Sequence, residues 1–472
     1  MTAGKKFLRA ITIVIAALAA MILVVALGFS DALLNRYAKG RIEAAFAEAY
    51  PGYVLKLGSL HYNLFKNFSE GRTVSLLASD SSLRAGAHSL SISGIGWHEL
   101  VIQRGITPDA VKSSVLSADD VLIHLARSKL DIRCGHLQIS AADSAFAIAD
   151  ASVEFAASRY HLSSPMIRAD ARDSLLTAEA IVLRPIAGDD DFFAASSYRR
   201  TRAALKIRKL SLQGTPVLDL LEGKAMLARS LECDAPEISL LVNRDKLGAP
   251  DTEAPLMPAE ALAALGSSIR LDSLVVRDAR LEYGERVDAQ GKPGVITFDS
   301  VQLSASDIEN APRHTIAIEA KGRFMHGGIM SVSMRIPMTP HELSFRYHGA
   351  LTAMDVTALN RFLETAEHTR ISRGTLREAS FDVRVERGRA SGSVRMLYDD
   401  LYVTMLDPET GSGKAVGERL ATTLANLVKI RGSNTEDRLK IGTVTYVRRH
   451  SDTFMNVAWF SLRSGVGSVV GF

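Results

Sequence analysis

Residues 330–336 of this chain read MSVSMRI, an alternation of apolar residues with serine and arginine. Successive side chains of an extended strand point to opposite faces, so the pattern puts methionine, valine and isoleucine on one face and the polar residues on the other. The same period of two recurs at 343–347 (LSFRY), 381–385 (FDVRV) and 394–398 (VRMLY). These stretches predict half-buried β-strands.

Less regular runs of the same kind extend this prediction over most of the chain. Turn-forming pairs such as Gly327-Gly328 and Arg387-Gly388 separate several of them. Many short antiparallel strands with one apolar face predict a mainly β fold. The further predicted strands lie at 53–57, 122–125, 137–139, 178–183, 205–212, 274–276, 296–303 and 316–320.

Helices are predicted at only a few places. Apolar spacing indicates a helix over 31–50 that ends before Pro51, and a short one over 258–265 after a proline-rich stretch. A third is expected over 353–366, where Thr352 to Asp355 resembles a capping box. Residues 414–430 predict an amphipathic helix. Residues 454–462 are interpreted as helical, although their length also allows a strand.

The N-terminus predicts attachment to a membrane. Residues 10–29 form an apolar run without a charge, and residues 1–9 contain three basic residues and no acid. About 20 apolar residues are needed for a helix to cross a bilayer, and a basic flank favours the cytoplasmic side. A signal peptide cleaved near 26–28 is the alternative, but the run is long for one. We expect a single-pass anchor with the rest of the chain outside the cytoplasm.

Composition shifts and breaks in the pattern divide the chain into predicted regions. The proline-rich stretch near 250–258 is the clearest internal boundary. The predicted regions are a cytoplasmic stub and transmembrane anchor (1–30), a juxtamembrane helix (31–50), an N-terminal β-region (51–249), a linker with a short helix (250–268), a C-terminal β-region with the inserted helix 353–366 (269–406), and a basic C-terminal region of helices and strand (407–472).

Charge is unevenly distributed along the chain. The formal net charge is +4, but residues 414–472 alone carry nine Lys/Arg against four Asp/Glu. A basic end suits anionic lipid headgroups or an acidic partner, and it is equally compatible with an ordinary solvated surface. An exported location removes nucleic acid as a partner.

No motif predicts catalysis, a cofactor or a metal. Gly411-Ser-Gly413-Lys414 lacks the spacing and the following Ser/Thr of a phosphate-binding loop. Cys134 and His136 would share one face of a strand, but zinc needs three or four ligands. Cys134 and Cys233 could pair in an exported compartment or stay free and buried. Asp189 to Asp191 are expected to cap or decorate a loop.

The chain resembles the AsmA-like family of bacterial cell-envelope proteins. The resemblance begins with the anchor and helix and continues through 52–60 (GYVLKLGSL) and 269–283 (IRLDSLVVRDARLEY). It is most specific from Gly349 to Leu401 and ends in the segment 454–465, while residues 150–250 fit least well. It is a profile of alternation and spacing and contains no catalytic motif.

The resemblance implies a bacterial inner-membrane protein with a single-pass anchor and the bulk of the chain in the periplasm. It further implies a long curled antiparallel sheet, open along one side, with an apolar concave face. Such a protein would be no enzyme and would need no cofactor. It would bind or conduct phospholipid or another envelope lipid in support of outer-membrane biogenesis, with the inner membrane and an envelope protein at its C-terminus as partners.

The alternative is a structural or scaffolding envelope protein, in which the apolar face is a dry core packed on a second sheet and the C-terminus docks a partner.

The lipid-binding interpretation predicts two sets of site residues. Lipid-groove candidates are Ile316, Ile318, Met330, Val332, Met334, Ile336, Leu343, Phe345, Tyr347, Phe381, Val383, Val385, Val394 and Met396. Candidates for membrane or partner contact are Arg448, Arg449, Phe454, Trp459, Phe460 and Arg463.

Overall fold

The computed structural model describes most of the chain from Lys39 onward. The predicted anchor, residues 31–38 of the predicted juxtamembrane helix and residues 416–430 of a predicted C-terminal helix lie outside the described residues. Among the helices that are described, none is long and apolar enough to span a bilayer. The described residues are 39–63, 68–94, 114–126, 129–217, 225–248, 255–264, 268–288, 291–311, 314–339, 342–406, 413–415 and 431–471.

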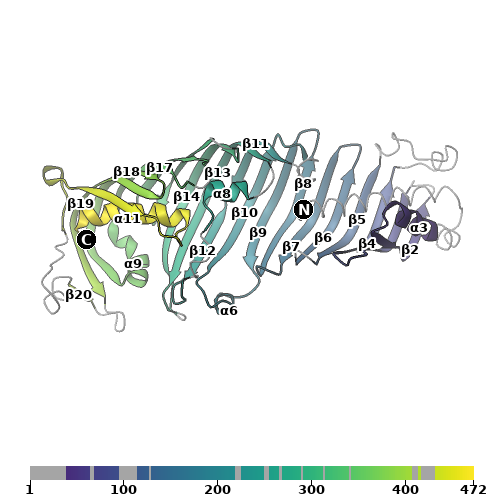
Figure 1. Ribbon diagram of the computed structural model, residues 1–472, viewed down its shortest axis with the longest axis horizontal. Coiled ribbons are helices and arrows are strands. Elements are labelled where there is room, and N and C mark those ends of the chain that lie inside the picture. Colours follow the sequence, from purple (N-terminus) through teal and green to yellow (C-terminus); the bar gives the residue numbers. More distant parts are fainter. Residues whose placement is uncertain are drawn as a thin grey trace. The chain divides into compact units, whose positions relative to one another are not determined.

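Strands make up most of the described chain, and the few helices are short apart from the first and the last (Figure 1). The prediction of a mainly β, mostly antiparallel fold is therefore confirmed. The chain divides into two compact units. Unit 1 comprises Met1–Ile186 and Ile207–Ala228, and unit 2 comprises Ala187–Lys206 and Arg229–Phe472.

The described residues of unit 1 form one helix followed by strands that pair antiparallel in sequence order from β3 to β9. β1 and β2 both pair with β3. The boundaries between the two units fall inside β10 (Thr201–Gln213) and β11 (Ala225–Asp234), so each of these strands has residues in both units. The other elements are α3 (Lys39–Ala49), β1 (Tyr53–Lys56), β2 (Ser59–Asn63), β3 (Phe68–Ala78), β4 (Leu83–Ser93), β5 (Val115–Leu125), β6 (Leu130–Ser140), β7 (Ala145–Phe155), β8 (Tyr160–Asp170) and β9 (Leu175–Pro185).

Unit 1 contains a structural repeat that the alternation analysis missed. Strands β5 to β9 are each 11 residues long, and each begins 15 residues after the one before. The turns repeat as well, because the last residue of each has a left-handed backbone. These residues are Lys129, Ser144, Arg159 and Ser174, with φ values of 49°, 53°, 60° and 50°.

The alternation is interrupted near the middle of these strands. Asp120, Asp150 and Ala180 each have positive φ at the sixth residue of β5, β7 and β9, and the cross-strand pair at this level is missing, while the register is the same on both sides. The apolar face changes position there, because Ile132 and Leu137 of β6 both pack on the apolar core although they are five residues apart. Cys134 and His136 therefore lie on opposite faces, and the expectation that they share one is wrong.

The repeating unit is a hairpin of two strands. The change of face at mid-strand gives neighbouring strands different sets of apolar positions. In β5 and β7 the apolar face takes positions such as Leu116 and Phe146, the second of each strand. In β6 and β8 it takes the first position, Leu130 and Tyr160. Two successive 15-residue repeats are therefore needed before the pattern recurs.

Helix α3 closes the N-terminal strands of unit 1. Ile42 and Phe46 are fully buried in an apolar core with residues of β1 to β5. The Glu43 carboxylate accepts the Leu57 N–H at 2.8 Å, and the Lys39 ammonium donates to the Gly58 carbonyl at 3.3 Å. These bonds satisfy backbone groups that an edge strand otherwise leaves open. From Lys39 to Ala49, the predicted helix is confirmed.

Unit 2 continues with longer strands that pair antiparallel, except that β12 and β13 are parallel. Its elements are α6 (Asp189–Ala194), β12 (Glu237–Asn243), α8 (Pro258–Ala263), β13 (Ser268–Arg286), β14 (Gly294–Glu309), β15 (Thr315–Phe324), β16 (Ile329–Pro337), β17 (Phe345–Asp355), the 3-10 turn η2 (Val356–Leu359), α9 (Asn360–Ala366), β18 (Thr369–Glu386), β19 (Arg389–Leu406), β20 (Gly413–Ala415), the 3-10 turn η3 (Glu436–Arg438), β21 (Ile441–Val447) and α11 (Phe454–Val470).

Two helix predictions in unit 2 need correction. Thr352 does not cap a helix, because it is held in β17 by pairing with Glu378 of β18. Asp355 alone is the cap, and its carboxylate accepts the Thr357 N–H at 2.9 Å. Lys414 and the residue after it pair with β19 as β20, so the expected helix does not begin there. The helical reading of 454–462 is confirmed, and α11 continues to Val470.

Glycines let α11 lie directly on the sheet. A Cβ at Gly465 would overlap the side chain of Val394 and lie 2.8 Å from Cγ2 of Val444. A Cβ at Gly442 in β21 would overlap the Gly465 carbonyl. The helix and the strands therefore approach backbone to backbone at this point.

We expect Gly465→Val to destabilise unit 2 by about 3 kcal/mol, because the added side chain has no space in the packed core. Gly432→Ala is the control, since its Cβ would make only an ordinary contact at 3.7 Å with the Leu401 carbonyl. That change should stay within about 0.5 kcal/mol. Denaturant unfolding followed by circular dichroism measures both, and equal effects would contradict the close approach.

The hairpin repeat predicts how unit 1 tolerates deletions. Removing residues 130–159 takes out β6 and β7 and joins β5 to β8 with the native facing pattern, so the variant should fold. Removing only 130–144 puts β7 where β6 was and turns its apolar positions to the polar face. We expect this shorter deletion to lose cooperative unfolding by circular dichroism. Equal stability of the two variants would argue against a two-strand repeat.

Candidate functional site

The predicted groove residues of unit 2 belong to one apolar core. Val383, Val385 and Val394 are at most 1% exposed, and Phe345 is 2% exposed. Buried with them are Ile316, Ile336, Leu343, Tyr347 and Phe381, while Ile318, Met330, Val332, Met334 and Met396 are half-buried against the same core.

Helix α11 covers this face. Its residues Val457 and Val469 are fully buried in the same core. The Tyr347 hydroxyl donates to the Ala458 carbonyl of the helix at 2.7 Å, and burial raises the pKa of that phenol. The Phe345 ring lies 4.6 Å from that of Phe454, centroid to centroid. The apolar face around β17 to β19 is thus occupied by the chain's own helix.

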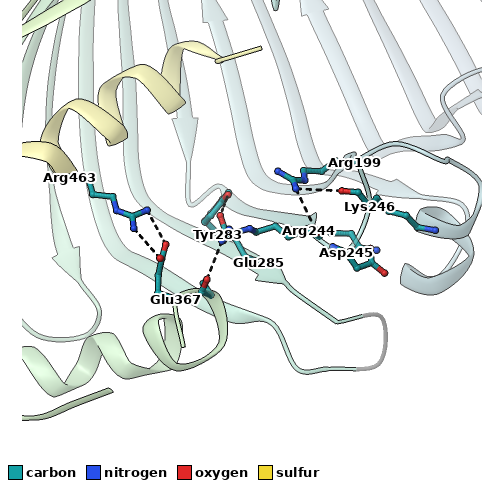
Figure 2. A network of polar contacts seen from close by, with 10 residues as sticks. Arg199, Arg244, Asp245, Lys246, Tyr283, Glu285, Glu367 and Arg463 are labelled. Carbon is teal, nitrogen blue, oxygen red and sulfur yellow. Dashed lines mark hydrogen bonds and ion pairs between the residues drawn. The ribbon is translucent and has the colours of Figure 1, made fainter. Parts of the chain in front are cut away.

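Four of the six predicted C-terminal contact residues contact other parts of the protein, and the other two are exposed. Phe454 packs on Phe345, and the Phe460 ring lies 5.6 Å from that of Tyr446, so both aromatic rings face the protein. Arg463 forms two 3.0 Å bonds to the Glu367 carboxylate (Figure 2). Arg448 donates to the Pro255 carbonyl at 3.5 Å. Trp459 remains 45% exposed, and Arg449 is exposed too.

A polar network joins α9 to the ends of β12 and β13 (Figure 2). Arg244 donates to Glu285 at 2.7 Å and to the Ala366 carbonyl, the last of α9, at 3.2 Å. Burial works to lower the pKa of Arg244, but the hydrogen bond and charge of Glu285 outweigh it and leave the pKa raised. The Tyr283 hydroxyl also donates to Glu285, at 2.8 Å. Each charge is neutralised within the network, whose role is to hold these elements.

Arg199 completes this part of the network from an adjoining loop. It reaches the carbonyls of Arg244 and Lys246 at 3.4 and 3.5 Å (Figure 2). Near it, Asp189 pairs with Arg202 at 2.8 Å, and Arg286 pairs with Asp190 at 2.6 Å. The acidic run 189–191 forms the first turn of α6, where acids are favourable, so it belongs to a helix start and not to a loop.

A second apolar face lies in unit 1, and sequence analysis did not list it. Cross-strand pairing aligns apolar residues into rows over β6 to β9. Most of these side chains are half-buried, and in the described chain only neighbouring strands make extensive contact with β6, β7 and β8. We call these residues the apolar face of unit 1. One row is Ile132, Val153, Leu162 and Leu183, and the other is Leu137, Ile148, Ile167 and Ala178.

The opposite face of the same strands is polar. A row aligned with the first contains Arg133, Ser152, Ser163 and Val182. Strict alternation fails at the middle of each strand, so a period of two is found only in short parts of these strands. The 15-residue spacing of the strands was the signal that could have found them.

Ser89, Asp119 and His136 form a polar cluster with the residue types of a serine-hydrolase triad, but the carboxylate lies between the other two. Ser89 Oγ donates to Asp119 at 2.6 Å, and His136 Nδ1 lies 2.7 Å from the other carboxylate oxygen. These bonds hold the pKa of Asp119 below its usual range. A nucleophile needs the histidine between serine and carboxylate, whereas here the carboxylate is central. The cluster therefore does not activate Ser89.

The cysteines and metal-ligand types form no reactive centre in the part of the chain described. Cys134 and Cys233 are free thiols, and burial raises the pKa of Cys134 to about 11, which keeps it protonated and unreactive. Of the described residues, none form a group of three or more metal-ligand side chains.

No protein-family model matches this chain, and no curated protein sequence matches it.

Tyr347→Phe tests how α11 is held on the core. The change removes one buried hydrogen bond and should cost about 1 kcal/mol, with faster hydrogen exchange in the first half of α11. Tyr402→Phe is the matched control, because Tyr402 is 43% exposed. Exchange in α11 that is the same in both variants would show that the Tyr347 bond does not anchor the helix.

Proposed function

We propose that this chain is a membrane-anchored, non-enzymatic protein of the AsmA type that binds or conducts lipid acyl chains along the apolar face of unit 1. The observation that carries the proposal is a run of half-buried apolar rows over which no described helix or second sheet packs extensively. An apolar surface of this kind, rimmed by polar residues, is typical of a binding surface.

The chemistry of the face suits acyl chains. A lipid tail needs a continuous apolar surface and no hydrogen-bonding or catalytic partner. The paired rows supply aliphatic side chains from four successive strands.

The membrane location in the proposal rests on the sequence. The apolar run at 10–29 with its basic flank supports a single-pass anchor in a bacterial inner membrane, with the remaining chain in the periplasm. Lipid of that membrane is then the available ligand, and a role in outer-membrane biogenesis fits the location.

A scaffolding role is the second candidate, and one observation favours it for unit 2. There the part of the apolar face around β17 to β19 is buried beneath α11, as in a dry core. The two candidates differ in what they require of unit 1. Lipid transport needs its apolar face to be occupied by lipid, whereas a scaffold does not.

Lipid extracted from the purified chain and identified by mass spectrometry tests the proposal. The double variant Val153→Glu with Leu162→Glu puts two charges on the apolar face, where neither charge would have a partner. We expect roughly tenfold less co-purified lipid than with the unaltered chain.

The matched control is Ser152→Glu with Ser163→Glu. These residues are the sequence neighbours of the first pair, are themselves cross-strand partners and face the opposite side. The control should retain its lipid. If the first variant is folded by circular dichroism and carries as much lipid as the control, the proposal is wrong.

A further inference from the structure

One end of the unit 2 sheet gathers arginines from two distant turns. Arg387 lies in the turn between β18 and β19, and Arg389 begins β19. Arg389 pairs with Val447, the last residue of β21, and the Arg448 N–H donates to the Gly388 carbonyl at 2.8 Å. Strand pairing therefore places Arg387 and Arg389 beside Arg448 and Arg449.

The charges at this end are predominantly positive. Arg387, Arg389 and Arg449 are exposed. Arg387 faces Glu342 at 3.8 Å, and Arg384 faces Glu386 at 3.5 Å, but these exposed pairs are weak. Asp452 is only 5% exposed and is used internally. These five arginines thus outnumber the three acids described beside them.

Apolar side chains are exposed among these arginines. Val447 is 54% exposed, and Met455 in the first turn of α11 is 66% exposed. Leu256 is 61% exposed and follows Pro255, whose carbonyl accepts a hydrogen bond from Arg448 at 3.5 Å. Trp459 lies one turn beyond Met455 on α11 and is 45% exposed. Large apolar side chains rarely collect on a surface without a partner.

The loop that displays Arg449 is held in place. The Asp452 carboxylate accepts the Arg449 N–H at 2.7 Å and the Tyr446 hydroxyl at 2.7 Å. Burial, with the charge and hydrogen bond of Asp452, raises the pKa of Tyr446 to about 12, so this bond persists at neutral pH. Binding at this surface would need little ordering of the backbone.

We infer that this end of unit 2, formed by Arg387, Arg389, Arg449, Val447, Leu256 and Met455, binds the surface of an anionic phospholipid membrane. Basic residues are attracted to anionic headgroups, and exposed leucine, valine and methionine enter the headgroup boundary. An acidic protein would use the same arginines, but it would not require the apolar residues. The inference does not rest on lipid transport by unit 1.

Vesicle flotation tests this surface. The full-length chain, held in phosphatidylcholine nanodiscs, is mixed with phosphatidylcholine vesicles that contain or lack phosphatidylglycerol. We expect binding only to the anionic vesicles, and weaker binding at higher salt. Each basic residue near an anionic surface contributes about fivefold, so Arg387→Glu, Arg389→Glu and Arg449→Glu together should lower the partition coefficient at least about a hundredfold.

The charge-matched control is Lys321→Glu, Arg323→Glu and Arg335→Glu, which changes three exposed basic residues of β15 and β16. It should bind nearly as well as the unaltered chain. A third variant, Val447→Ser with Met455→Ser, should bind several-fold more weakly. Equal loss in the control would reduce the effect to net charge and overturn the inference.

Two further outcomes would also overturn it. One is full vesicle binding by the triple-arginine variant. The other is binding of an acidic polypeptide such as polyglutamate in place of anionic vesicles, which would assign the surface to an acidic protein. Lipid content of the same samples, measured by mass spectrometry, separates failure at this surface from failure of the proposed function of unit 1.

Discussion

An apolar sheet face exposed to water costs free energy in proportion to its area, and this constraint shapes both units. Unit 2 meets it with helix α11, whose valines complete the core beneath it. Among the described helices of unit 1, α3 lies over the first strands, while the rows on β6 to β9 are half-buried. The same alternation of residues thus gives a helix-covered core in one unit and, among the described residues, a half-buried apolar face in the other.

Covering a sheet with a helix also protects its edge. β21 pairs with β19 on one side, and its outward N–H groups at Thr443 and Thr445 donate to the hydroxyls of Ser468 and Ser464 in α11. α3 does the same for unit 1 through Glu43. An edge closed in this way cannot template pairing with another chain. The serines and glycines of α11 therefore matter as much as its valines.

The proposed functions depend on surfaces that no described element covers. In the polar clusters described above, side chains are paired with one another, as Arg244 with Glu285 and Ser89 with Asp119 show. The surfaces in question are an apolar face in unit 1 and a basic, apolar end in unit 2. Both proposals take lipid as the partner, in one case the acyl chain and in the other the headgroup surface.

The sequence by itself determined the mainly β fold, because period-two alternation survives in any strand with one buried face. It also located α8, α9 and α11. It could not distinguish a groove from a core, since Val383 and Val153 have the same local pattern and differ only in whether a distant helix covers them. Nor could it bring Arg389 beside Arg449, which strand pairing across more than fifty residues decides. Those outcomes depend on non-local packing, which local residue patterns do not encode.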